Sequence, residues 1–221
     1  FYPEGHPLHG VETVEIRHMT AKDEDILTSQ SLIKKGIVME RLLQSVLVDK
    51  SIPTDDLLIG DRNALLVACR RYGYGPLYEV KVSCPSCGKS DKYEFDISKW
   101  EVSSCDFEEK GITKTENNTF LVILPFSEVS VEYKPLTVTD EKKMESVGKR
   151  NEKLNIPGAA STTFLKEITV SVNGHYDMES IFNFVENVPA LDSQILRSSY
   201  SYSIADIEAK SDFACTSCGY E

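Results

Sequence analysis

The chain has 221 residues, of which 41% are hydrophobic and 27% charged, and its 24 basic and 35 acidic side chains leave a net charge of −11. This length can bury a core without disulfide bonds, and the composition is typical of a folded globular protein. The acidic balance disfavours proteins that bind the backbone of nucleic acids, because such binding needs clustered Lys and Arg to neutralise phosphates.

No apolar run in the sequence reaches the length of about 18 residues that a transmembrane helix needs. Residues 1–20 also lack the basic and apolar regions of a signal peptide. We therefore expect an intracellular chain without a membrane contact, whose six cysteines are thiols or thiolates instead of disulfides.

The first residues are predicted to lack regular structure. Residues 1–10 hold two prolines, two glycines and the histidines His6 and His9, a composition typical of an extended arm. The two histidines could chelate a metal ion, but no cysteine lies near them in the sequence, which disfavours that role. Apolar and polar residues alternate imperfectly over residues 11–18, which predicts a strand.

The next segment carries helix signals. Thr20 and Asp23 resemble a capping box, so a short helix is predicted to run to about Ser29. Over residues 37–49 the apolar residues recur with helical spacing, which predicts an amphipathic helix.

A third helix is predicted to begin near Asp61, which can cap it, and to end at Gly73 and Gly75. Cys69 falls on the apolar side of this helix. We expect a buried and inert thiol there, because a reactive thiol needs an exposed, electropositive setting.

Two hairpins are predicted in the middle of the chain. Residues 77–97 alternate on both sides of a cysteine turn, which indicates a hairpin with that turn at its tip. Residues 103–118 are polar and are interpreted as a loop or ragged strand, and we do not expect its Cys105 to bind metal. Residues 119–124 and 128–133 predict a second hairpin.

Residues 139–154 are charged and predict a solvent-facing helix that could contact a partner. Periodicity leaves residues 161–172 open between a helix and a helix that becomes a strand. Two short helices should flank Pro189, with Asp177 and Asp192 as their caps.

Residues 204–212 alternate in polarity and predict a C-terminal strand. This strand could pair with the hairpin at residues 77–97 and bring the two ends of the cysteine pattern together.

The strongest pattern is a C-x-x-C-G motif that occurs twice, at residues 84–88 and again at residues 215–219. This spacing lets two thiolates bind one metal ion from a tight turn, and the glycine relieves the backbone after the second sulfur. Two such turns supply four sulfurs, enough for a closed tetrahedral site, although more than half of the chain separates them. The predicted metal ligands are Cys84, Cys87, Cys215 and Cys218.

Structural Zn²⁺ suits these matched motifs best. An iron–sulfur cluster is disfavoured because its ligands more often come from irregular spacings. Redox-active dithiols and four free thiols are the remaining alternatives. A catalytic zinc is disfavoured because sulfur would fill all four positions and leave none for water or substrate.

Patterns typical of catalysis are absent from the sequence, including the nucleophile elbow, the phosphate-binding loop, the dinucleotide-binding glycine motif and the H-E-x-x-H zinc motif. Paired carboxylates such as Asp55-Asp56 and Glu108-Glu109 lie in polar surroundings typical of solvated charges. We therefore expect that the protein is not an enzyme.

The order of helices, strands, helices and strand indicates an α+β fold with a split, zinc-ribbon-like site of four cysteines. Six segments are predicted: an N-terminal arm and strand (1–18), a helical region (19–76), a zinc-knuckle hairpin (77–100), a β-rich insertion (101–136), a second helical region (137–203), and a C-terminal strand with the second knuckle (204–221).

The chain resembles the baseplate hub or hub-assembly proteins of T4-like tailed phages. The resemblance covers most of the chain, is strongest over residues 17–100 and at the C-terminus, and finds no counterpart for residues 101–170. It depends on Met19–Ser29, Leu32–Gly36, Gly60–Leu66, Tyr72–Gly75 and the two cysteine motifs.

The resemblance implies a structural component of a contractile-tail baseplate, located in the virion and assembled in the host cytoplasm. Its partners would be other baseplate or tail proteins, without nucleic acid or membrane, and several copies per baseplate are allowed. Residues 1–10 and 139–154 are the candidate contact elements. The alternatives are an assembly chaperone that is absent from the mature particle, and a zinc-ribbon module that binds nucleic acid.

Overall fold

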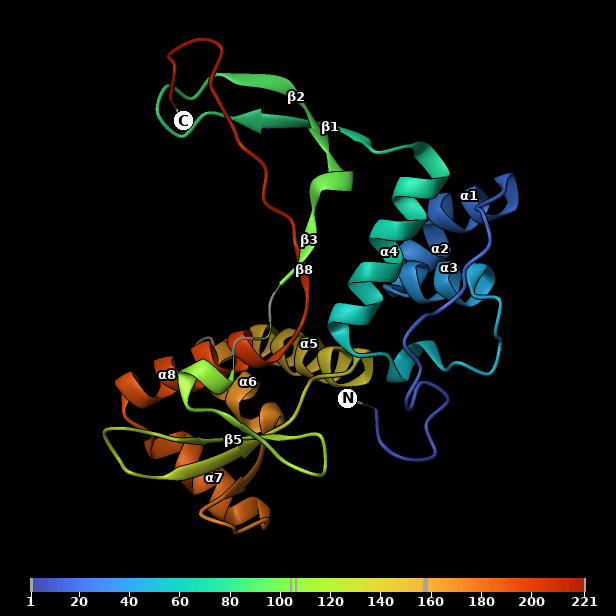
Figure 1. Cartoon of the computed structure of the whole chain (residues 1–221). Coiled ribbons are helices and arrows are strands. Elements are labelled where there is room, and N and C mark those ends of the chain that lie inside the picture. Colours follow the sequence, from blue (N-terminus) through green and yellow to red (C-terminus); the bar gives the residue numbers. More distant parts are fainter. Residues whose placement is uncertain (1, 104, 106, 157–158, 221) are drawn as a thin grey trace. The chain divides into compact units, whose positions relative to one another are not determined.

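The protein is described by a computed structural model that covers residues 2–103, 105, 107–156 and 159–220. It combines helices with antiparallel strands and is an α+β protein, as predicted (Figure 1). The chain forms two compact units. Unit 1 consists of Phe1–Val14, Ser51–Arg62 and Ser104–Ala205, and unit 2 consists of Glu15–Lys50, Asn63–Ser103 and Asp206–Glu221. The six segments predicted from the sequence are each continuous along the chain, unlike these two units. That they are domains stays a prediction.

Unit 1 is built on a four-stranded antiparallel sheet with the order β4-β5-β6-β7. The predicted second hairpin is confirmed as β5 (Phe120–Ile123) and β6 (Ser130–Tyr133), and the short β4 (Thr113–Lys114) extends it at one edge. At the other edge lies β7 (Thr169–Val172), which directly follows α6 (Ala160–Ile168). Residues 161–172 are therefore a helix that becomes a strand, which was the second of the two predicted alternatives.

The core of unit 1 lies on the sheet face that carries the fully buried Phe120, Val131 and Tyr133. Leu165 and Ile168 of α6, and residues of α7 (Met178–Asn187) and α8 (Ala190–Ser203), pack against this face. The Tyr133 hydroxyl is buried there but shares a hydrogen bond of 2.7 Å with the Ser203 hydroxyl, so burial leaves it satisfied.

The predicted charged helix is confirmed as α5 (Val138–Lys153), which Thr137 and Asp140 begin with a capping box. Asp177 caps α7 as predicted, since its carboxylate accepts a hydrogen bond from the Ser180 N–H. The prediction for Asp192 is wrong, because α8 starts earlier, after Pro189. The buried Asp192 carboxylate instead accepts hydrogen bonds from the Phe126 and Ser127 N–H groups.

The N-terminal residues have no helix or strand over 2–15, but the prediction of an extended arm is wrong. They fold into consecutive turns against their own unit, and Leu8 is buried. The Tyr2 hydroxyl accepts a hydrogen bond from the Leu58 N–H at 3.0 Å and donates one to Asp61 at 2.7 Å. This segment is thus fixed at the start of α4 (Ile59–Tyr74).

The predicted helix near Asp61 is α4, which starts two residues before Asp61 and continues through Gly73, while Gly75 has a φ of +86° just after its end. The boundary between the two units falls within α4. The short 3-10 helix η1 (Thr54–Asp56) precedes it, and η2 (Ile97–Lys99) and η3 (Glu108–Lys110) occur later in the chain.

The N-terminal part of unit 2 is helical. The predicted helices are confirmed as α1 (Ala21–Thr28) and α3 (Val38–Val46). The short α2 (Gln30–Lys35) between them was not predicted, because it is only six residues long; Gly36 ends it with a φ of +68°. The predicted strand over residues 11–18 is wrong and reduces to one isolated bridge between Ile16 and Leu47.

A buried carboxylate connects these helices. Asp23 is fully buried and accepts two hydrogen bonds from the Arg17 guanidinium, at 2.7 and 2.9 Å. The Ser45 hydroxyl and the backbone N–H of Thr20 also donate to it. The guanidinium is the main cause that holds the pKa of Asp23 well below its usual range.

The strands of unit 2 form two small sheets. The predicted hairpin is confirmed as β1 (Leu77–Ser83) and β2 (Ser90–Asp96). The predicted pairing of the C-terminal strand with this hairpin is wrong. That strand is only β8 (Ile207–Glu208), and it pairs with β3 (Glu101–Val102).

Candidate metal centre

The first cysteine pair lies at the tip of the β1–β2 hairpin. Because the register pairs Ser83 with Ser90, the residues between them form the turn. Within it the Cys84 N–H donates to the Lys89 carbonyl at 2.9 Å, and the Gly88 N–H donates to the Cys84 carbonyl at 2.9 Å. Gly88 has a φ of +71°, a conformation that a residue with a Cβ adopts only under strain.

The second pair repeats this turn near the C-terminus. The Cys215 N–H donates to the Tyr220 carbonyl at 2.8 Å, and the Gly219 N–H donates to the Cys215 carbonyl at 3.0 Å. Gly219 also has a φ of +71°. The two C-x-x-C-G motifs therefore form the same turn on different supports, one on a hairpin and the other on an extended segment.

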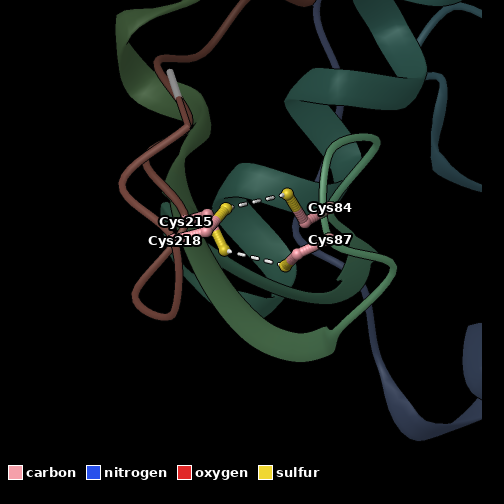
Figure 2. Close-up of side chains that lie close together, drawn as sticks. All are labelled: Cys84, Cys87, Cys215 and Cys218. Carbon is pink, nitrogen blue, oxygen red and sulfur yellow. Dashed lines mark hydrogen bonds between the residues drawn. The ribbon is translucent and has the colours of Figure 1, made fainter.

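The two turns face each other and bring the four predicted ligands together (Figure 2). The Sγ atoms of Cys84 and Cys218 are 3.7 Å apart, and those of Cys87 and Cys215 are 3.8 Å apart. All four sulfurs lie within 4.8 Å of one another. Cys84 and Cys215 are buried, whereas Cys87 and Cys218 are exposed.

These distances fit one metal ion better than disulfides. A disulfide needs its sulfurs about 2 Å apart. Four sulfurs bound to one zinc ion at about 2.3 Å form a tetrahedron whose edges measure about 3.8 Å. The two cross-turn distances match those edges, while a cluster of several iron atoms would hold its cysteines around a larger centre.

The pKa values of the two cysteines in the C-terminal turn are displaced in opposite directions. Backbone N–H groups of Ser217 and Cys218 lower the pKa of Cys215 to about 6. The Tyr220 N–H lowers the pKa of Cys218, but the neighbouring sulfurs, chiefly Cys215, and desolvation outweigh it and raise that pKa to about 11. Four thiolates this close repel one another, and a divalent cation removes that obstacle.

Residues around the sulfurs hold the C-terminal turn on the hairpin. The Tyr93 and Phe213 rings pack with their centroids 4.8 Å apart, and the Thr216 hydroxyl donates to Asp91 at 3.2 Å. Farther along the segment, the Trp100 indole N–H donates to the Ser211 hydroxyl at 3.2 Å. Sequence reasoning missed these contacts because each joins residues more than one hundred positions apart. The aromatic residue two positions before the second motif was the one signal available.

The remaining candidate residues lie outside this centre. Cys69 is buried as predicted, with 4% of its surface exposed, and burial raises the pKa of its thiol. Cys105 belongs to unit 1. The His6 ring stacks on Tyr2, and His9 Nδ1 is hydrogen-bonded to the Tyr2 carbonyl. Among the residues that the structure describes, the four cysteines are the group able to hold a metal ion with three or more ligands.

Fold and site together define an α+β protein in which four cysteines lie close enough to hold one metal ion. A family model described as T4 bacteriophage base plate protein matches residues 6–221, so the chain belongs to that family. No curated protein and no solved structure matches the chain. Membership makes it a component of the phage tail that associates with other baseplate proteins. Within the described part of the chain, no helix is long and apolar enough to span a membrane.

Proposed function

We propose that the protein is a structural subunit at or near the hub of a contractile-tail baseplate, and that a zinc ion fastens its C-terminus to its middle. We call this proposed link, formed by zinc and Cys84, Cys87, Cys215 and Cys218, the zinc clasp. The observation that supports it is the cluster of four Sγ atoms within 4.8 Å of one another, presented by two matched turns. The family match supports the assignment of the protein to a baseplate. The hub position follows the resemblance of residues 17–100 and the C-terminus to hub and hub-assembly proteins.

The clasp has a mechanical consequence because of where the ligands lie in the sequence. Ser104–Ala205, the largest segment of unit 1, lies between the two cysteine pairs. A bound ion therefore closes a loop that contains this whole segment. Closing a long loop removes conformational freedom from the unfolded chain, and the binding free energy of the ion adds to the stability of unit 2.

The same centre argues for a role without catalysis. When four thiolates occupy all four positions of a tetrahedral ion, no position is left for water or substrate. A subunit of a large particle needs rigidity and complementary surfaces, and a closed zinc site supplies rigidity. The net charge of −11 opposes the alternative of a module that binds nucleic acid.

Metal analysis of the purified full chain tests the clasp. We expect close to one equivalent of zinc, and we expect the Cys215→Ser variant to lose it because one ligand is removed. Cys105→Ser is the matched control, since this cysteine lies outside the cluster and its loss should leave the zinc content unchanged. Full zinc occupancy in Cys215→Ser, or iron in place of zinc in the native chain, would contradict the proposed site.

Mass spectrometry of purified phage particles tests the position in assembly. A structural subunit should be present in a fixed stoichiometry with other baseplate proteins. Absence from mature particles, together with presence in assembly intermediates, would favour a hub-assembly chaperone instead.

A further inference from the structure

The hairpin of unit 2 has an unpaired edge. Its sheet contains β1 and β2 only, among the residues described. The Ile97 N–H donates to the Pro76 carbonyl and the Cys84 N–H donates to the Lys89 carbonyl, so these two pairs bracket the ladder. Hydrogen-bonded pairs alternate in antiparallel strands, and the backbone groups of Tyr78, Val80 and Val82 therefore point toward β2.

The other residues of β1 direct their backbone N–H and C=O groups away from β2. These residues are Leu77, Glu79, Lys81 and Ser83, and all four are exposed. The Leu77 carbonyl accepts a hydrogen bond from Arg70 at 3.0 Å. From elsewhere in the described chain, no hydrogen bond reaches the backbone of the other three. This edge can accept another strand.

The charges along this edge select the strand that fits. We propose that β1 of a second copy of this chain adds to the edge in antiparallel orientation, about a two-fold axis at Val80. In this register Glu79 of each copy lies opposite Lys81 of the other. Registers centred on Glu79 or on Lys81 would place two like charges against each other, which is unfavourable.

The charge pattern inside the hairpin agrees with this partner. Glu79 lies opposite Glu94, and Lys81 lies opposite Lys92, so the two middle cross-strand pairs of this face combine like charges. Glu79 finds compensation in a diagonal ion pair with Lys92 at 2.7 Å. Lys81 has no acidic partner within the described residues. The second copy supplies an opposite charge beside each of the two residues.

The apolar face of the hairpin would be extended at the same time. Tyr78, Val80 and Val82 lie on the face opposite the charges, and none of them is fully buried. A two-stranded sheet is marginal in water, whereas a longer sheet with a continuous apolar face is more stable. The isologous pairing produces a four-stranded sheet. In it the Val80 residues of the two copies contact each other, and Tyr78 of one copy lies opposite Val82 of the other.

Sedimentation of the full-length, metal-loaded chain over a concentration series tests the dimer. We expect wild type to dimerise, and Glu79→Lys and Lys81→Glu alone to weaken dimerisation by about tenfold or more, because both edge contacts become repulsive. An equimolar mixture of the two variants should dimerise again. In the mixed pair one copy carries lysine at both positions and the other carries glutamate at both, so each contact across the edge joins opposite charges. Rescue therefore shows that the two β1 edges pair with each other.

Two controls separate edge pairing from loss of fold. Lys92→Gln removes the ion pair within the hairpin but leaves the edge intact, so it should still dimerise. Lys81→Pro removes an outward N–H without touching the β1–β2 ladder and should abolish dimerisation. Zinc content is measured for every variant, so that damage to the clasp is detected independently.

A monomeric wild type at about 100 µM, well above the Kd of a stable interface, would overturn the proposal. So would a dimer that Lys81→Pro leaves unchanged, or single variants whose mixture fails to recover. If wild type is monomeric and another baseplate protein binds it in a manner sensitive to Lys81→Pro, the edge takes a different partner and the second copy is excluded.

Discussion

Asp23 illustrates how a single side chain can organise a helical region. Its carboxylate is fully buried and accepts hydrogen bonds from Arg17 and Thr20, which precede α1, and from Ser45 of α3. Burial of a charge is costly unless it is paired and hydrogen-bonded, and here both conditions hold. The charged form is therefore the stable one, and the pKa of Asp23 is held far below its usual range, chiefly by Arg17.

This depressed pKa gives the stability of unit 2 a pH dependence. A carboxyl group with a lowered folded-state pKa contributes stability that is complete above its unfolded pKa of about 4 and is lost as the pH falls below it. We expect the free energy of unfolding to decrease from about pH 5 to pH 2, and Asp23→Asn to flatten this decrease. At neutral pH the variant should be less stable by about 1–2 kcal/mol.

Fluorescence of Trp100, the one tryptophan of the chain, reports this transition because Trp100 belongs to unit 2. Urea titrations at several pH values give the free energies. An Asp23→Asn profile that parallels wild type across this range would show that other carboxyl groups cause the acid sensitivity.

Among single residues, the sequence predicted those whose local conformation depends on a short motif. The four cysteines and Gly88 and Gly219 could be predicted because C-x-x-C-G specifies its own turn. The prediction that Asp192 caps a helix was wrong for the opposite reason. Its carboxylate bonds backbone groups some 65 positions earlier in the chain, and nothing in the neighbouring sequence indicates them.

At the scale of elements, the helices and longer strands were predictable where the periodic pattern and the ends agreed. α3, α4, α5 and the two hairpins were found in this way. Short elements were harder to predict: α2, with six residues, was not predicted, and the strand predicted over residues 204–212 reduces to the two residues of β8. A pattern of a few residues carries little periodicity, and β8 exists because β3 lies beside it, a contact between segments far apart in sequence.

The prediction of an extended N-terminal arm was wrong. Proline and glycine indicate the absence of regular structure, but they do not indicate whether the segment packs against the rest of its unit. Tyr2 is the residue that docks it. Burial raises the pKa of Tyr2 well above its usual value. Its hydroxyl satisfies the Leu58 N–H, an N–H at the beginning of α4 that has no partner within the helix.

We expect Tyr2→Phe to destabilise unit 1 by about 1–2 kcal/mol, since it leaves the Leu58 N–H without its acceptor. Hydrogen exchange of the Leu58 amide should accelerate at the same time. Tyr202→Phe is the matched control in unit 1, because Tyr202 contacts Lys110 through its ring, which phenylalanine keeps. Equal effects of the two substitutions would show that the Tyr2 hydroxyl has no special role.

For the whole molecule, the sequence predicted the α+β fold and the approach of the two cysteine pairs, but not the division into two units. Each unit is assembled from three separate stretches of chain. Sequence patterns describe neighbours along the chain, whereas this division depends on which distant segments pack together. The four-cysteine cluster and the β3–β8 pair both bring together stretches of unit 2 that lie on either side of Ser104–Ala205 in the sequence.

This arrangement predicts a local response to metal removal. Without the ion, the segment after β8 is held by few contacts, among them the Tyr93–Phe213 packing and the Trp100–Ser211 hydrogen bond. None of the four cysteines belongs to the core of unit 1. The buried residues of that core lie on β5, β6 and the helices and pack against one another. The stability of these two regions should therefore differ in its dependence on zinc.

After chelation we expect faster hydrogen exchange at residues 213–220 and 84–89, while β5 and β6 keep their protection. Cys105→Ser treated in the same way should match wild type, and Cys215→Ser should show the fast exchange before any chelator is added. If chelation instead exposes β5 and β6 to the same extent, the ion stabilises both units as one cooperative structure. If residues 213–220 keep their protection, the contacts of Phe213 and Thr216 are sufficient, and the ion contributes little to holding the C-terminus.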